Sequence, residues 1–205
     1  MQQQQESQSV VSADVVVSSP LSFSVNGIDV DASGRVLVLG GKRGLHLFDF
    51  EDIKQPRAHI SLQSFFEVSC VSCNPNLSKA SLCVGAVNES VYLWDLEHCQ
   101  QVTVSERKNG HQRAVTDVCW SSGNDNVFAT SSGDTTILLW DLRESLAKPT
   151  LRLRGWSAAP SRISWHRSDA NLLASSHEQE VRLWDIRKPR ANIEFISAHT
   201  SKIYD

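Results

Sequence analysis

The sequence predicts an all-β protein in which one four-stranded unit recurs along the chain. The first observation is a repeated apolar run, which reads LHLFDF, VYLWDL, ILLWDL and VRLWDI at residues 45–50, 91–96, 137–142 and 181–186. The second is its period, because the successive aspartates of these runs lie 46, 46 and 44 residues apart. A period of about 40 to 45 residues ending in Trp-Asp is typical of a blade of a β-propeller. We therefore expect a propeller in which these runs are the third strands.

The chain divides into four repeats and the start of a fifth. We expect the repeats at residues 21–62, 63–104, 108–153 and 156–195, with the next one beginning at 198–205. In the third repeat, four β-rich runs separated by turn residues cover residues 114–120, 126–131, 136–141 and 149–153. The fourth repeat has matching runs at residues 161–165, 171–176, 180–185 and 191–195. The two central runs are apolar almost throughout, as expected of a blade that buries both faces.

Composition favours a globular protein and excludes two classes of partner. The chain has 205 residues, of which 40% are hydrophobic and 21% are charged. A net charge of −3 gives no general attraction for nucleic acid. No apolar stretch approaches the roughly 18 residues of a membrane span, so we expect no direct membrane insertion and a cytoplasmic location. Residues 1–13 are expected to be a disordered leader without the features of a secretory signal, and residues 14–205 a partial propeller.

These Trp-Asp runs and their spacing resemble the WD-repeat family over nearly all of the chain. The Trp-Asp pair occurs three times, as Trp94-Asp95, Trp140-Asp141 and Trp184-Asp185. In that family a His near the start of a blade, a Ser or Thr in the second strand, an Asp in the next hairpin and the Trp form a buried hydrogen-bonded network. The resemblance implies such a tetrad in the third repeat, formed by His111, Ser132, Asp134 and Trp140.

The other repeats match this pattern less closely. Asn88 and Glu178 occupy the hairpin position of the second and fourth repeats, and the first repeat has neither the His nor the Trp. We expect apolar packing, more than a polar network, to hold these blades.

The third repeat also contains the residue types of a hydrolytic triad. His111, Asp117 and Asp134, with several serines nearby, could supply a Ser-His-Asp arrangement. The tetrad accounts for the same residues without chemistry, because buried polar groups need hydrogen-bond partners. We therefore expect no catalytic residue and no enzymatic activity.

Two further motifs are expected to be structural. Cys70 and Cys73 have the spacing of a zinc-binding pair, but positions three apart in a strand face opposite sides, so we expect reduced core thiols. Residues 40–44 lack the pattern of a phosphate-binding loop and are expected to form a hairpin. The sequence predicts neither a metal site nor a cofactor.

Candidate interaction residues follow the Trp-Asp pairs. Arg143 and Arg187 complete two consecutive W-D-x-R sequences. In the WD-repeat family this pattern can mark substrate receptors that dock on the damage-binding adaptor of cullin-RING ubiquitin ligases, although Arg follows Trp-Asp in blades of many functions. Trp156 is a candidate interface anchor, because Trp dominates interface hot spots. The basic run at residues 187–190 lacks the aromatic platform of a nucleic-acid site.

The repeats stop before a ring is complete. Aligning His199 with His111 places Asp205 inside the first strand of a fifth repeat. WD-repeat propellers commonly close with seven blades, and residues 14–17 resemble the outer strand that the N-terminus of the family gives to its last blade. We therefore expect an incomplete propeller, and we interpret the sequence as a truncated product, an incomplete gene model or an engineered fragment.

A closer resemblance covers residues 26–50, 164–189 and 198–203. These stretches are similar to the N-terminal propeller of scaffold subunits of the GATOR assembly, which supports amino-acid signalling to the target of rapamycin kinase at the lysosome. The resemblance implies a non-catalytic interaction module whose partners are other GATOR components, which would recruit it to the lysosomal surface. A ligase substrate receptor and a hydrolase stay as alternatives.

Overall fold

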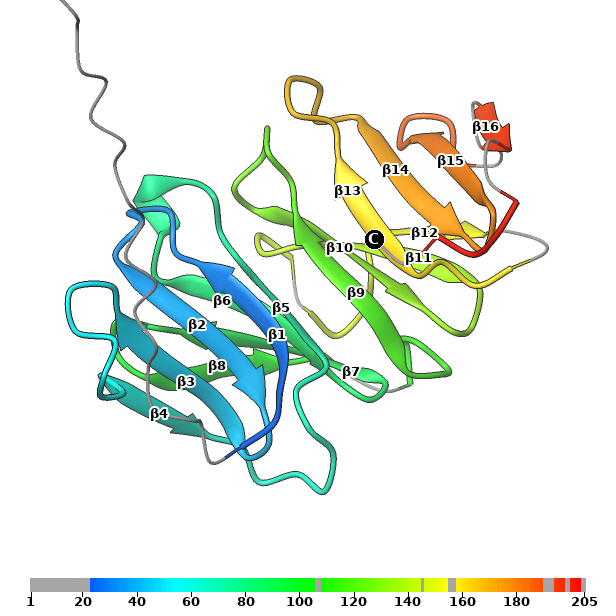
Figure 1. Ribbon diagram of the computed structural model, residues 1–205. Coiled ribbons are helices and arrows are strands. Elements are labelled where there is room, and N and C mark those ends of the chain that lie inside the picture. Colours follow the sequence, from blue (N-terminus) through cyan, green and yellow to red (C-terminus); the bar gives the residue numbers. More distant parts are fainter. Residues whose placement is uncertain are drawn as a thin grey trace, which may run out of the picture.

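A computed structural model describes residues 23–105, 108–144, 146–154, 158–189, 194–197 and 200–203. Within these ranges the chain is all-β, as predicted. Its sixteen strands form four antiparallel sheets of four strands, with one short 3-10 helix at Leu77–Lys79. Figure 1 shows the four sheets following one another round an arc. The architecture is an incomplete β-propeller in which each sheet is one blade.

Each blade is a meander in which every strand pairs with the next strand along the chain. Blade 1 contains β1 (Val25–Val30), β2 (Val36–Gly41), β3 (Gly44–Asp49) and β4 (Ala58–Ser61). Blade 2 contains β5 (Cys70–Cys73), β6 (Leu82–Val87), β7 (Ser90–Asp95) and β8 (Gln100–Val104). Blade 3 contains β9 (Val115–Trp120), β10 (Val127–Ser132), β11 (Thr136–Asp141) and β12 (Leu151–Arg154). Blade 4 contains β13 (Arg162–Trp165), β14 (Leu172–His177), β15 (Glu180–Asp185) and β16 (Glu194–Ser197).

The first strands of the blades hold the arc together. β1 contacts β5, β5 contacts β9, and β9 contacts β13. Hydrogen bonds also cross these junctions: Asp29 accepts from the backbone N–H of Cys73 at 2.7 Å, and Asp117 accepts from that of Ile163 at 2.9 Å. At one end of the arc, Ile28 on β1 is 66% exposed. The fourth strands are the outer edges of their sheets.

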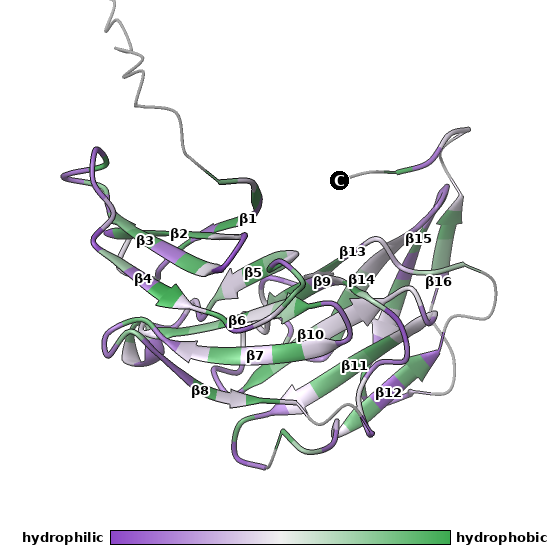
Figure 2. Cartoon of the chain, turned by 90° about the horizontal axis from the view of Figure 1, so that it is seen from below, coloured by the Kyte–Doolittle hydropathy of each residue, from purple (hydrophilic) through white to green (hydrophobic). Residues whose placement is uncertain are grey.

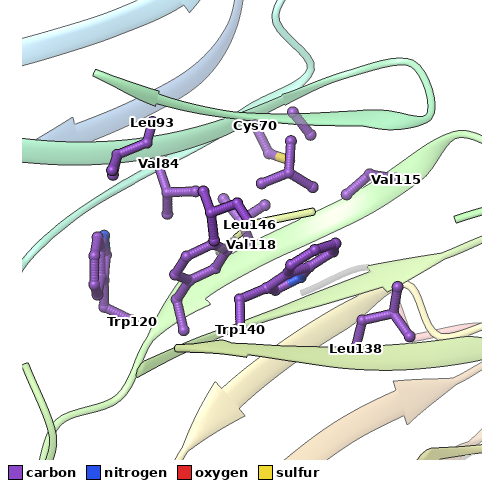
Figure 3. Close-up of a cluster of buried hydrophobic side chains, with 12 residues drawn as sticks. Cys70, Val84, Leu93, Val115, Val118, Trp120, Leu138, Trp140 and Leu146 are labelled. Atoms are coloured by element: carbon purple, nitrogen blue, oxygen red, sulfur yellow. The ribbon is translucent and has the colours of Figure 1, made fainter. Parts of the chain in front are cut away.

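Apolar clusters fill the spaces where consecutive blades meet. One cluster lies between each pair of neighbouring blades, and Figure 3 shows the cluster between blades 2 and 3. Trp94, Trp140 and Trp184 are at most 2% exposed, and each packs in the cluster shared with the preceding blade. Hydrophobic residues accordingly run along the strands, while hydrophilic residues gather in many connecting loops (Figure 2). Burial on both faces explains why the central strands are apolar almost throughout.

The turn between the second and third strands contains a residue with positive φ in every blade. These residues are Arg43, Asn88, Thr135 and Glu178, with φ values of 72°, 54°, 67° and 48°. Left-handed residues are required where a tight turn must match the twist of its two strands. Residues 40–44 lie in such a strand-to-strand hairpin, between β2 and β3.

Two outer strands lie later in the chain than the sequence pattern predicts. β12 covers Leu151–Arg154, whereas the pattern predicts residues 149–153. β16 covers Glu194–Ser197, whereas the pattern predicts residues 191–195, of which residues 191–193 lie outside the described ranges. All four residues of β16 are exposed, so no alternation of buried and exposed residues marks its limits in the sequence.

Candidate functional site

A chain of hydrogen bonds runs through the core of blade 3. His111 lies in the loop before β9, and its Nδ1 lies 3.1 Å from Asp134 Oδ2 in the β10–β11 hairpin. Its Nε2 lies 2.8 Å from Thr130 Oγ1 on β10. Trp140 on β11 donates its indole N–H to the same hydroxyl oxygen at 2.9 Å. His111, Thr130 and Trp140 are at most 1% exposed, so the network joins these elements away from solvent.

The hydroxyl of this network belongs to Thr130, so the prediction of Ser132 is wrong. Positions two apart in a strand point the same way, and the sequence alone therefore offers two hydroxyls on one face of β10. Ser132 stands nearer the hairpin, where its hydroxyl lies 2.9 and 3.0 Å from backbone carbonyl oxygens of the loop before β9. Trp140 pairs with Phe128, two residues before Thr130, and this register brings the indole to Thr130.

The direction of each hydrogen bond follows from the carboxylate at the end of the chain. Asp134 can only accept when ionised, so Nδ1 of His111 carries the proton that faces it. In the tautomer that carries its proton on Nδ1, Nε2 is an acceptor. The Thr130 hydroxyl, which accepts from Trp140, donates its own proton to that nitrogen. Every polar side-chain group of the network has a partner in this arrangement.

Asp134 fastens the hairpin to the loop that carries His111. Its Oδ2 also accepts from the backbone N–H of Gln112 at 2.8 Å, and its Oδ1 accepts from the backbone N–H and the hydroxyl of Thr136 at 2.9 and 2.6 Å. Burial alone would raise the pKa of Asp134. The hydrogen bonds from His111, Thr136 and Gln112 outweigh burial and hold the pKa well below its usual range. The carboxylate is therefore ionised at neutral pH.

The connection of hydroxyl, imidazole and carboxylate is also that of a hydrolytic triad. A catalytic hydroxyl must reach its substrate, but Thr130 is 0% exposed and its oxygen accepts from the Trp140 indole. Asp117 is engaged elsewhere, because it accepts from the backbone N–H of Ile163 in blade 4. The arrangement therefore serves the packing of blade 3.

Blade 4 builds a similar chain from different positions. His177 lies on β14, two residues after Ser175, and its Nε2 lies 2.7 Å from Ser175 Oγ. Trp184 donates its indole N–H to the same oxygen at 2.7 Å. Nδ1 of His177 donates to the backbone carbonyl of Ala158 at 2.9 Å. This network was not predicted from the sequence, although a Ser and a His two residues apart on one strand face are a usable signal.

The imidazole of His177 has no carboxylate partner within its network. Burial lowers the pKa of His177, and the hydrogen bond to Ala158 opposes that change. Arg182 lowers it further and Glu180 raises it. Because the pKa is lowered, the buried imidazole is held in its neutral form at neutral pH.

Blades 1 and 2 use packing at the equivalent place. In blade 2, Gly85 takes the strand position of Thr130, and a Cβ atom there would lie 2.8 Å from the ring of Trp94. The indole of blade 2 therefore occupies the space that a hydroxyl side chain fills in blade 3. In blade 1, Phe48 stands in place of the Trp and is 5% exposed.

Arg143 and Arg187 each bind the aspartate of their own Trp-Asp pair. Arg143 donates from Nε and Nη2 to Asp141 at 2.9 and 2.5 Å, and Arg187 donates to Asp185 at 2.8 and 2.6 Å. Hydrogen bonds from Arg187 lower the pKa of Asp185 to about 2. The two arginine side chains are 64% and 61% exposed. They are accessible to a partner, but a carboxylate already occupies the fork of each guanidinium.

Cys70 and Cys73 point to opposite sides of β5. Cys70 packs between blades 2 and 3, and Cys73 packs between blades 1 and 2, so the two thiols cannot hold one ion. Burial raises the pKa of the Cys70 thiol to about 12. Across the residues described by the structure, no group of three or more His, Cys, Asp or Glu side chains is arranged to hold a metal ion. Trp156, His199 and residues 14–17 lie outside the described residues.

An exposed aromatic pair in the loop between β4 and β5 was not anticipated. Phe65 is 105% exposed and Phe66 is 54% exposed. The signal in the sequence is two adjacent Phe residues between one repeat and the next. Exposed large apolar side chains often mark sites of protein interaction.

Comparisons with known proteins agree with this fold. The family described as WD domain, G-beta repeat matches residues 101–141 and 147–185. The chain is 33% identical over 193 residues to the GATOR2 complex protein WDR59 of Homo sapiens, covering 94% of this chain and 20% of the relative. It is 32% identical over 181 residues to GATOR2 complex protein Wdr59 of Drosophila melanogaster, covering 86% and 18%. It is 30% identical over 178 residues to maintenance of telomere capping protein 5 of Saccharomyces cerevisiae, covering 87% and 15%.

The chain spans about a fifth or less of the length of these relatives. Within its described residues, no helix has the length and apolar character that a membrane crossing requires. The repeat match, the four meander sheets and the buried Trp-Asp strands support one another. Together they identify the chain as a WD-repeat protein whose four blades form an incomplete β-propeller.

Proposed function

We propose that the chain is a non-catalytic scaffold subunit of a GATOR-type complex that promotes amino-acid signalling to the target of rapamycin kinase. The observation that carries this proposal is the 33% identity to WDR59, which extends over 94% of the chain rather than over single repeats. The name of that relative places it in the GATOR2 complex. The chain would contribute surfaces for binding other subunits of such a complex.

The geometry supports binding more than chemistry. In the described part of the chain, three hydroxyls contact an imidazole, and all three are buried: Thr130 is 0% exposed, Thr136 5% and Ser175 2%. Large apolar side chains, in contrast, are exposed in a loop, with Phe65 and Phe66 as the main example. Propellers present such loops on a rigid frame, which suits protein recognition. We propose a cytoplasmic location, with recruitment to the lysosomal surface through the partner subunits.

Affinity purification of the tagged chain from cells, followed by mass spectrometry, tests the proposal. We expect GATOR subunits among the recovered proteins. A variant with Phe65→Ser and Phe66→Ser should keep the fold, because both side chains are exposed, and it reports whether this loop contributes to capture. Recovery of chaperones alone by the wild-type chain would contradict the scaffold function.

A second candidate is a substrate receptor of a cullin-RING ubiquitin ligase. The specific observation is that Arg143 and Arg187 repeat one geometry on consecutive blades, each exposed and each bound to its own aspartate. Docking on the ligase adaptor would require these arginines. We expect Arg143→Ala combined with Arg187→Ala to abolish recovery of the adaptor if this function is correct. Unchanged recovery of GATOR subunits by the same variant would favour the scaffold.

A further inference from the structure

A pocket of about 500 Å³ opens beside the β10–β11 hairpin of blade 3. Its walls are the loop before β9, the hairpin itself and the outer strand β12. The charged groups that line it are three arginines and one aspartate: Arg113, Arg152, Arg154 and Asp134. The pocket therefore has an excess of positive charge in a chain whose net charge is −3.

The aspartate of this pocket does not neutralise the arginines. The two oxygens of Asp134 accept hydrogen bonds from His111, Gln112 and Thr136, all within blade 3. In the part of the chain that the structure describes, no ion pair involves Arg113 or Arg154.

The third arginine is held in place by neutral groups. Nη2 of Arg152 donates to the backbone carbonyl of Asn109 at 3.3 Å. A carbonyl oxygen can orient a guanidinium without cancelling its charge. Among the residues that the structure describes, the pocket thus contains one positioned arginine and two arginines without an ion pair.

The blade fold does not require arginine at these positions. Strand pairing places Arg152 opposite the second residue of the Trp-Asp run, and the equivalent residues of blades 1, 2 and 4 are His59, Val104 and Phe195. Arg154 lies two residues along β12 from Arg152, so both side chains leave the same face of the strand. Unpaired arginines gathered at one place, without a packing reason, indicate a site for an anion.

We propose that this pocket binds an acidic segment of a partner protein through Asp or Glu carboxylates. The planar fork of a guanidinium forms two parallel N–H···O bonds with a carboxylate. The three arginines, one in the loop before β9 and two on β12, would fix successive carboxylates of one segment and exclude basic or apolar segments. The inference rests on the proposed scaffold function, to which it adds the chemistry of one partner.

A direct binding measurement tests this pocket. The probe is a short fluorescein-labelled peptide in which Glu alternates with Ser, titrated with the full chain and followed by fluorescence anisotropy. We expect Arg113→Gln combined with Arg154→Gln to weaken binding about ten-fold or more. The matched control is Arg35→Gln combined with Arg167→Gln, which removes the same charge from two exposed arginines elsewhere. Circular dichroism melting should show that both double variants remain folded.

Three results would overturn the proposal. An equal loss of affinity in the control variant would show that net charge, and not the pocket, governs binding. Binding only when the Ser residues are phosphorylated would assign the site to phosphoryl groups. Stronger binding of a single-stranded oligonucleotide at the same salt concentration would assign it to nucleic acid.

Affinity purification separates this proposal from the scaffold function. We expect the Arg113→Gln, Arg154→Gln chain to lose some of the subunits that the wild-type chain recovers. If this variant recovers every subunit that the wild-type chain recovers, the proposal for the pocket is wrong and the scaffold function is unaffected. If the wild-type chain recovers none while the peptide still binds in the pocket, the scaffold function fails and the site remains.

Discussion

Blades 3 and 4 bury the same group, an indole N–H, with two different sets of residues. In both blades the Trp donates to a hydroxyl on the second strand, and the hydroxyl contacts an imidazole Nε2. In blade 3 the imidazole is that of His111, in the loop before the first strand, and its Nδ1 hydrogen-bonds to the carboxylate of Asp134. In blade 4 the imidazole is that of His177, on the second strand itself, and its Nδ1 hydrogen-bonds to the backbone carbonyl of Ala158.

The difference separates the part of the network that blades 3 and 4 share from the part that is present in blade 3 alone. The hydroxyl and the imidazole are present in both, because an unpaired indole N–H in the core costs free energy. The aspartate is an addition that joins the hairpin to the preceding loop through Gln112 and Thr136. Blade 3 should therefore lose more stability than blade 4 when its network is cut.

Removing the indole should have the largest effect. We expect Trp140→Ala to lower the free energy of unfolding by about 3 to 5 kcal/mol, as for other buried aromatic residues. Trp184→Ala should lower the free energy of unfolding by less, because the blade 4 network does not include a hairpin carboxylate like that of Asp134. Urea denaturation followed by circular dichroism measures both. Trp140→Phe keeps most of the packing and should cost less than Trp140→Ala; a freely tolerated Trp140→Ala would refute the role of this residue in the blade.

Removing the hydroxyl should have the next largest effect. Thr130→Val preserves shape but leaves the Trp140 indole and His111 without their shared partner, at a cost of about 1 to 3 kcal/mol. Ser175→Ala should act in the same way on blade 4. Thr130→Ser is the matched control and should restore most of the stability. If Ser132→Ala proves more damaging than Thr130→Val, the assignment of the hydroxyl to Thr130 is incorrect.

The fold class was predictable because its pattern is imposed by burial on two faces. The third strands of all four blades carry the apolar run that the sequence shows, and they lie where the period places them. The exposed outer strand β16 carries no such pattern, and its C-terminal limit lies two residues beyond the predicted one. A buried strand requires apolar residues at fixed positions, which can be recognised in the sequence, whereas an exposed strand does not.

The site was less predictable, because it depends on register and on contacts between distant residues. Thr130 and Ser132 share a strand face, and only the pairing of β10 with β11 decides which hydroxyl meets the indole. His177 completes its network through the backbone carbonyl of Ala158, and a carbonyl has no signature in sequence. The arginines of the blade 3 pocket meet only because β12 returns to the hairpin.

Removing the charge of Asp134 in blade 3 should have a smaller effect on stability, and that effect should depend on pH. The folded state lowers the pKa of Asp134, so this group stabilises the fold above its unfolded pKa of about 3.9. That contribution is lost as the pH falls below about 4 and toward the folded pKa. We expect Asp134→Asn to be less stable than wild type at neutral pH and to approach it in acid. A constant difference between pH 7 and the lowest pH at which both fold would contradict this role.

Replacing the imidazole of His177 in blade 4 should have the smallest effect on stability, and this effect should occur in a different pH range. Burial lowers the pKa of His177, so the unfolded chain binds more protons than the folded chain below the unfolded pKa of about 6.5. Stability from the neutral imidazole is therefore complete above that pH and falls as the pH drops toward the folded pKa. We expect the melting temperature of the wild type to decrease from about pH 7 to about pH 5, and that of His177→Gln to decrease less. Asp134→Asn should keep the wild-type slope in this range, because its titration lies lower. If His177→Gln and wild type have parallel profiles, then the protonation of His177 does not distinguish blade 4 from blade 3.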